Sequence, residues 1–298
     1  MPKSVTVLNR SNQTVYLYND DLTKASPVKP VKLADNGSTA IPLLQGDQKR
    51  LYVAADPLTR SLEKGSLPDV FNPAADAGVE YSFFEYAYEP NNDRYTADLS
   101  YIDEFSFPLT LRFTNLGSYP AAQNGFEYGF SDIDTVIGNL RSRSTAAQPW
   151  EALVWPKDPV TSWAPQPPYP SGLSRVVGPN KVWAQQRATT NPVNPKFPGI
   201  GPWQPQSYFP FVQALPQDGK QLFGSVDNWT GWQDGLNPKI LPKVDPGKTG
   251  YVQALRAAAT PDAKGKYGFF TFPNDNIQGE FTYVPEAADL RITVHPLS

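Results

Sequence analysis

The sequence predicts a mainly β protein, built as an antiparallel sandwich or barrel, and three observations support this class. Proline accounts for 32 of the 298 residues, about twice its ordinary share, which argues against a helical bundle. Short runs of β-branched and aromatic residues recur between turn signals. The chain also contains 7 Trp, 15 Tyr and 16 Phe, enough large side chains to fill a substantial core.

Strand signals appear near both ends of the chain, separated by turns rich in Asn, Asp and Gly. They cover residues 5–8, 14–18, 49–54, 79–88, 95–110, 267–272 and 290–294. Two helices are also expected. The first is indicated by apolar residues at helical spacing behind Ser131 as a possible N-cap, namely Ile133, Val136, Ile137 and Leu140. The second covers residues 249–259, with Thr249 as its cap.

The order of these elements predicts two domains. Residues 1–118 and 248–298 would share one β-domain, and residues 119–247 would form an inserted mixed α/β domain. Within the insert, residues 156–216 hold 14 of the 32 prolines together with Trp163, Trp183 and Trp203. A flexible linker rarely carries so many large aromatic side chains, so we expect an ordered excursion packed against the body.

Composition removes several kinds of chemistry. Without cysteine the chain has no thiolate zinc site, iron–sulfur cluster or cysteine nucleophile. The single histidine, His295, excludes multi-histidine metal centres, and its alternating surroundings indicate an ordinary strand position. We therefore expect no metal and no cofactor. Catalysis would have to use Asp, Glu, Tyr or Lys.

Charge and hydropathy narrow the range of partners. The net charge is −3, from 26 basic and 29 acidic residues, and no basic cluster suggests a nucleic-acid footprint. No stretch approaches the roughly 20 apolar residues of a membrane span. Residues 1–3 lead directly into strand-like sequence, so no signal peptide is expected at this start. We expect a monomer that binds neither nucleic acid nor membrane.

Candidate chemistry lies on the hairpin formed by the strands at 79–88 and 95–110. If its turn is centred near Asn92 to Arg94, Glu85 lies almost opposite Asp103. Alternation then places Leu99 and Tyr101 on the face of both carboxylates and Ser100 on the other face. A carboxylate among aromatic residues is costly unless it is paired or employed.

Two carboxyl groups on neighbouring strands are what glycoside hydrolysis requires, one protonated as general acid and the other ionised as base or nucleophile. The residues alone also allow a second interpretation, in which both are solvated carboxylates on an exposed sheet.

The hairpin resembles the acidic core of the family 64 glycoside hydrolases, the thaumatin-like bacterial β-1,3-glucanases that release laminaripentaose. The resemblance continues in the same order along nearly the whole chain, through an Arg-hydrophobic-Tyr strand, a late Phe-Pro motif and a terminal strand. The segments that carry it are residues 50–53, 85–88, 99–109, 272–277 and 289–294.

This resemblance implies a thaumatin-like β-barrel domain, an inserted mixed α/β domain, and a wide groove between them that accepts β-1,3-glucan. It also implies endo-acting hydrolysis with inversion, in which Glu85 is the general acid and Asp103 the general base. An extracellular location is implied by the same resemblance.

Several further residues are candidates for binding the glucan. They are Ser100 and Tyr101 on the hairpin, Asp275 in the late motif, and Trp229 and Trp232 in a turn-rich cluster. For any single tryptophan, core packing is the alternative.

The chain also departs from the family pattern. Ala87 replaces a threonine beside the acid, the loop between the carboxylates is about two residues longer, and Asn274 and Asn276 replace Tyr and Asp. These departures keep a second class open, a noncatalytic thaumatin-like protein with a glucan-binding, structural or toxin-related role.

Overall fold

The computed structural model describes a set of segments that together cover just over half of the chain. They are residues 3–20, 29–58, 79–90, 94–101, 104–119, 121–143, 150–156, 173–178, 250–270, 281 and 284–297. Strands dominate these segments, and the only helices in them are two α-helices and one short 3₁₀ helix, Trp150–Leu153. The predicted mainly β class is therefore confirmed.

One sheet brings the two ends of the chain together. In spatial order its strands are β10 (Glu127–Gly129), β9 (Leu109–Thr114), β15 (Asp289–Val294), β1 (Ser4–Asn9) and β4 (Ser38–Pro42). The β1 and β15 strands run parallel, and the other neighbours are antiparallel. The strands expected near both termini are thus confirmed, and they lie side by side.

A second, larger sheet carries the predicted hairpin. Its order is β13 (Phe269–Phe270), β7 (Arg94–Ser100), β6 (Tyr81–Tyr88), β5 (Gly46–Ala54), β2 (Val15–Asp20) and β3 (Val31–Leu33), and β14 (Val284–Pro285) also pairs with β7. A third, small sheet has the order β11 (Val154–Pro156), β12 (Leu173–Val177) and β8 (Glu104–Phe105).

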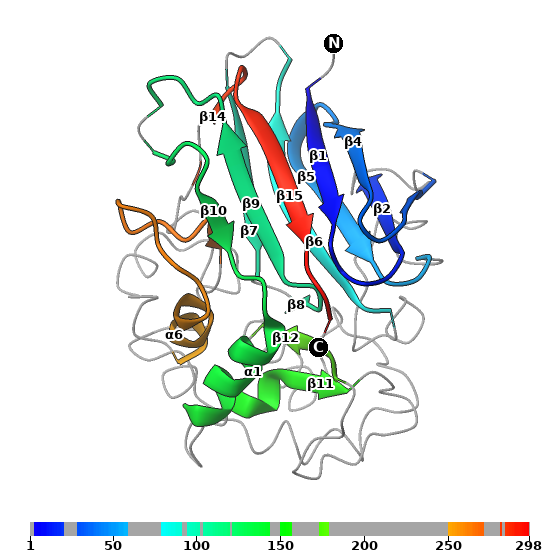
Figure 1. Ribbon diagram of the computed structural model, residues 1–298, viewed down its shortest axis with the longest axis vertical. Coiled ribbons are helices and arrows are strands. Elements are labelled where there is room, and N and C mark those ends of the chain that lie inside the picture. Colours follow the sequence, from blue (N-terminus) through cyan, green and yellow to red (C-terminus); the bar gives the residue numbers. More distant parts are fainter. Residues whose placement is uncertain are drawn as a thin grey trace, which may run out of the picture.

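The two larger sheets form a sandwich, one in front of the other in Figure 1. In the described segments neither sheet closes on itself, so the strands form an open sandwich, and the barrel expected from the resemblance is not confirmed. The single strand expected over residues 95–110 is wrong as well. It is divided into β7, β8 and β9, which belong to three different sheets, and Pro108 directly precedes the last of them. A proline cannot donate to a strand ladder, which favours a break at this point.

Strand alternation explains why the second sheet is buried on both sides. On β5, Leu51 and Val53 face the first sheet, whereas Tyr52 and Ala54 face outward. The side between the sheets joins the main core. The outward side forms a separate buried cluster of Tyr18, Tyr52, Ala54, Leu58, Tyr81 and Phe83.

Helix α1 (Ile133–Ser142) forms as predicted and buries its four apolar residues. Its N-cap is Asp132 and not Ser131, because the Asp132 side chain accepts a hydrogen bond from the Asp134 N–H at 3.0 Å. Helix α6 (Gly250–Ala257) lies beside α1, and the Asn139 side-chain amide donates to the Ala254 carbonyl at 3.1 Å (Figure 1). No helix in the described part of the chain has the length and apolar character needed to cross a bilayer.

The expected domain boundaries stay a prediction. Two observations bear on the segments they separate. The β10 strand comes from within 119–247 and is an edge of the sheet that contains both ends of the chain. Helix α6 comes from within 248–298 and packs against α1.

Two glycines near β13 allow a matched test of backbone and packing. Gly268 and Gly265 have φ values of +80° and +78°, but a Cβ at Gly268 would lie 2.3 Å from the Tyr128 Cβ, whereas at Gly265 nothing lies within 4 Å. In both alanine variants the left-handed backbone lowers the free energy of unfolding by about 1–2 kcal/mol. We expect Gly268→Ala to lose about 1–3 kcal/mol more than Gly265→Ala in urea unfolding, because it also overpacks Tyr128. Equal losses in the two variants would contradict this.

Candidate active site

A row of charged residues crosses the outward side of the second sheet. Glu85 on β6 lies opposite Arg50 on β5 and opposite Asp98 on β7. Because directly opposed residues of neighbouring strands share a face, the three side chains form one line, which we call the charged row. It lies on the same side of the sheet as Tyr52, Tyr81 and Phe83.

The predicted pairing of Glu85 with Asp103 is wrong, since the structure pairs Glu85 with Asp98. The midpoint of the observed register lies between positions 91 and 92, whereas the expected pairing required a midpoint at 94. Such a shift changes which residues share a face. Leu99 pairs with Phe84 on the side between the sheets, and Ser100 lies on the side of Glu85.

Arg50 holds the Glu85 carboxylate from one side. Its Nε and Nη2 both lie 2.8 Å from Oε1 of Glu85, and the two side chains are only 14% and 19% exposed. The guanidinium also lies over the Phe83 ring, with Cζ 4.3 Å from the ring centroid. These contacts fix the orientation of the Glu85 side chain.

Asp98 lies on the other side of Glu85 from Arg50, on β7. It was not identified from the sequence as a candidate site residue. Its side chain is buried, and Oδ1 accepts a hydrogen bond from the Phe281 N–H at 3.1 Å. This bond attaches the chain just after the late Phe-Pro motif to the strand beside Glu85. The Pro90-Asn91-Asn92 run is the signal that could have revealed Asp98, because a turn centred on the two asparagines gives the correct partner.

The aromatic residues beside Glu85 are packed together. Tyr52, Tyr81 and Phe83 are fully buried, with ring centroids 5.7 Å apart for Tyr52 and Phe83 and 6.3 Å apart for Tyr81 and Phe83. An aromatic-lined face was expected and is present. These three rings form part of a core, however, and they offer no open stacking surface.

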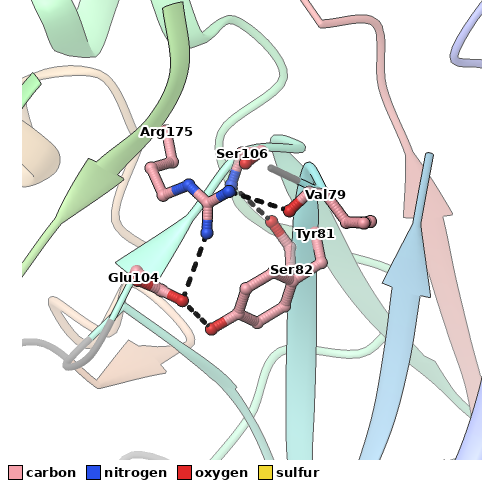
Figure 2. Close-up of polar contacts among 6 residues, drawn as sticks. All are labelled: Val79, Tyr81, Ser82, Glu104, Ser106 and Arg175. Carbon is pink, nitrogen blue, oxygen red and sulfur yellow. Dashed lines mark hydrogen bonds and ion pairs between the residues drawn. The ribbon is translucent and has the colours of Figure 1, made fainter. Parts of the chain in front are cut away.

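A buried ion pair lies within the small third sheet and contacts Tyr81 of β6 (Figure 2). Nη1 of Arg175, on β12, lies 3.4 Å from Oε1 of Glu104, on β8, and both side chains are completely buried. The Tyr81 hydroxyl donates to the same Glu104 oxygen, and Arg175 Nη2 donates to the Val79 carbonyl at 2.9 Å. We call Tyr81, Glu104 and Arg175 the buried triad.

Two further bonds in Figure 2 attach the same segment to β6. The Ser106 N–H lies 2.8 Å from the Tyr81 carbonyl and 3.0 Å from Oγ of Ser82. The Ser82 hydroxyl in turn donates to the Phe107 carbonyl at 2.8 Å. Glu104 directly follows Asp103 in the chain, so these contacts anchor the residue next to the predicted base.

On the other side of Asp103 the chain is anchored at Tyr101. This side chain is fully buried, its hydroxyl donates to the Leu109 carbonyl at 3.1 Å, and its ring packs 4.7 Å from that of Phe130. Burial raises the pKa of the Tyr101 hydroxyl above its usual range. Tyr101 is therefore a neutral side chain within the fold.

The remaining predicted site residues divide into two groups. Ser100 is buried at the end of β7, on the Glu85 side of the sheet and two residues beyond Asp98. The others, Asp103, Asp275, Trp229 and Trp232, lie outside the described residues, as do the three tryptophans of the proline-rich excursion.

His295 lies away from the charged row, just beyond β15 of the first sheet. Its Nε2 is 2.9 Å from Oγ1 of Thr110, and burial lowers its pKa. Within the described segments, no group of three His, Asp or Glu side chains is arranged to hold a metal ion.

In a mainly β fold, a glutamate held by an arginine beside a second carboxylate is compatible with the two-carboxylate chemistry of glycoside hydrolysis. The comparison with protein families makes this specific. The chain belongs to glycoside hydrolase family 64, the β-1,3-glucanases, whose sequence model matches residues 2–177. The match includes all three members of the charged row and also Asp103.

Known structures show more distant similarities. The laminaripentaose-producing β-1,3-glucanase of Paenibacillus barengoltzii has 14% identity and a TM-score of 0.49, with 99% of this chain and 76% of that chain covered. The same values hold for its complex with laminarihexaose. A β-1,3-glucanase domain from Clostridium beijerinckii has 13% identity and a TM-score of 0.35, covering 59% and 54% of the two chains. No curated protein sequence matches this chain significantly.

Proposed function

We propose that this protein is an endo-acting β-1,3-glucanase that hydrolyses its substrate with inversion of configuration. The observation that carries the proposal is the family match over residues 2–177, which includes Glu85 at a position held by an arginine. In this mechanism Glu85 protonates the leaving glycosidic oxygen. Asp103 removes a proton from the water that attacks the opposite face of the sugar.

The geometry of the charged row argues against Asp98 as the base. Inverting enzymes keep their two carboxyl groups about 6.5–9.5 Å apart, so that a water molecule fits between them. Directly opposed strand residues such as Glu85 and Asp98 have Cβ atoms only about 4.5–5.5 Å apart. Asp98 is also buried and accepts a backbone N–H. These features suit it to positioning the chain at Phe281.

Glu85 must carry a proton to act as an acid, and in this structure Arg50 holds its carboxyl group. We infer that glucan binding weakens this contact, so that the carboxyl group takes up a proton in the complex. Arg50 then has two roles: it orients the carboxyl group before substrate arrives, and it stabilises the charge that Glu85 acquires after proton transfer.

Replacing Arg50 tests this pairing. We expect Arg50→Gln to lower kcat/KM on laminari-oligosaccharides by about 10²-fold, because a misplaced catalytic group loses that much rate. Arg50→Lys keeps the charge but not the two-nitrogen contact, and it should fall between wild type and Arg50→Gln. Wild-type kinetics in Arg50→Gln would show that the contact has no part in catalysis.

The rest of the substrate site is also a proposal. We assign glucan contacts to Asp275, Trp229 and Trp232 and a supporting role to Ser100 and Tyr101, in a groove between a β-domain and the inserted segment, and we expect the protein to act outside the cell. The structure of the Paenibacillus barengoltzii enzyme complexed with laminarihexaose is that of a relative holding a glucan oligosaccharide. Because Ser100 and Tyr101 are buried here, they would act by shaping the site beneath the sugar.

Incubation of the purified protein with laminarin tests the function itself. Chromatography should show laminari-oligosaccharides, and proton NMR of the first products should show the α-anomer, since a β-linkage is cleaved with inversion. A β-anomer would contradict the mechanism but keep the activity. Binding to laminarin without any product would instead support the noncatalytic glucan-binding class.

A further inference from the structure

A polar pocket of about 410 Å³ opens on the first sheet, on the side that faces away from the second sheet. Seven residues line it: Ser4, Thr6, Arg112, Thr114, Asp289, Leu290 and Arg291. They come from β1, β9 and β15, which are neighbours in the sheet. The flanking residues Leu111 and Ile292 are fully buried in the core between the sheets, so alternation turns Arg112 and Arg291 outward.

Two arginines meet in this pocket. Arg112 on β9 lies directly opposite Arg291 on β15, and Thr6 on β1 lies opposite Arg291 from the other side. Like charges placed directly opposite each other destabilise a sheet. A pair of this kind therefore needs a compensating negative charge.

Glu127 on β10 lies directly opposite Arg112 and forms an ion pair with Arg291, so one carboxylate lies beside both arginines. Nη2 of Arg291 lies 3.0 Å from Oε2 of Glu127. The side chain of Arg112 makes no hydrogen bond or ion pair with any residue that the structure describes. In the same described segments, the Nε atoms of both arginines are buried and lack a hydrogen-bond partner. Buried donors are normally satisfied, so their arrangement points to a bound acceptor.

The acidic residue of the pocket does not supply this acceptor. Oδ2 of Asp289 accepts a hydrogen bond from the Asn115 side chain, and Asp289 lies at an exposed position. Arg112 and Arg291 thus lie beside two carboxylates, Glu127 and Asp289, and what stays unused is the hydrogen-bonding capacity of the Arg112 guanidinium. The hydroxyl groups of Ser4, Thr6 and Thr114 add neutral donors and acceptors around it.

We propose that this two-arginine pocket binds a single oxyanion group carried on a small hydroxylated molecule, such as a sugar acid or a sugar phosphate. The planar guanidinium fork binds carboxylate and phosphate oxygens through paired hydrogen bonds. The volume admits a molecule of monosaccharide size, and the lining hydroxyls fit its hydroxyl groups. The site belongs to the opposite side of the sandwich from the charged row, and it does not depend on the proposed glucanase activity.

Thermal unfolding with glucuronate and with glucose 6-phosphate tests the proposal, with NaCl added to equalise ionic strength. A ligand that binds only the folded state raises the Tm with increasing concentration. We expect wild type to show a saturable rise with at least one probe. The probe with the larger rise identifies the group as a carboxylate or a phosphate. No rise with either probe would overturn the proposal.

Arg112→Met is the decisive variant, and Arg10→Met is its matched control. Arg10 is an exposed arginine outside the pocket, so both variants remove one positive charge. We expect Arg112→Met to weaken probe binding at least tenfold without lowering the Tm in the absence of probe, because no described contact is lost. Probe binding by Arg10→Met and laminarin hydrolysis by Arg112→Met should remain at wild-type levels. Equal probe responses in wild type and Arg112→Met would overturn the proposal.

Arg112→Lys is a second variant that separates the loss of the guanidinium group from any effect of introducing a methionine. It keeps the charge but not the fork, so binding between that of wild type and Arg112→Met is expected. Full binding by Arg112→Lys would contradict recognition through paired hydrogen bonds.

Discussion

Glu85→Gln and Asp103→Asn should each lower kcat on laminarin by about 10²–10⁴-fold, the usual contribution of a general acid or base. Glutamine at 85 keeps the size of the side chain and can still accept from Arg50, but it has no proton to give to the leaving oxygen. Asparagine at 103 cannot take a proton from water. Initial rates with saturating laminarin measure both effects, and circular dichroism checks that each variant is folded.

Asp98→Asn is the matched control for this experiment, because Asp98 also lies beside Glu85. An asparagine Oδ1 can accept the Phe281 N–H as the carboxylate does. We therefore expect Asp98→Asn to keep a rate within a few-fold of wild type. If Asp98→Asn were inactive while Asp103→Asn remained active, the base would be Asp98, and the separation argument for an inverting pair would fail.

Arg175→Met should be the most damaging change to stability. Removing one partner of a buried ion pair typically costs about 3–5 kcal/mol, because the other charge stays buried without compensation. Arg175 and Glu104 are both completely buried, and the loss would also break the bond from Arg175 to the Val79 carbonyl. Urea unfolding followed by circular dichroism measures the free energy of unfolding directly.

The double variant Arg175→Met/Glu104→Gln separates charge from packing. It removes both charges of the buried triad, and the glutamine introduced at position 104 can still accept from the Tyr81 hydroxyl. We expect it to recover much of the stability lost in Arg175→Met, since an uncharged replacement of a buried pair is often close to neutral. A double variant less stable than Arg175→Met would mean that the charge itself is not the cause.

Local patterns in the sequence predicted most of the strands and both helices. The alternation around Leu51 to Ala54 and the helical spacing from Ile133 to Leu140 depend only on neighbouring residues, and both predictions are confirmed. The same kind of reasoning identified Glu85 as a residue of a hairpin strand. The family resemblance of the hairpin is also confirmed, because the family model matches residues 2–177, which include the hairpin.

The pairing of distant residues was beyond this reasoning. Asp98 was missed because an error of two and a half residues in the centre of one hairpin assigned the wrong partner to Glu85. The partnership of Glu104 with Arg175 could not be predicted at all, because a third sheet, built from separate short strands, brings them together. Nothing near either residue in the chain indicates the other.

The position of β15 has a consequence for the order of folding. This strand, Asp289–Val294, lies in the middle of its sheet, between β9 and β1. The parallel pairing of β1 with β15 therefore forms only after residues 289–294 have been synthesised. Contacts between residues so far apart close large loops and are formed slowly. During synthesis the exposed flanks of β1 and β9 are unpaired edges, so we expect this stage to be the one at which newly made chains associate wrongly.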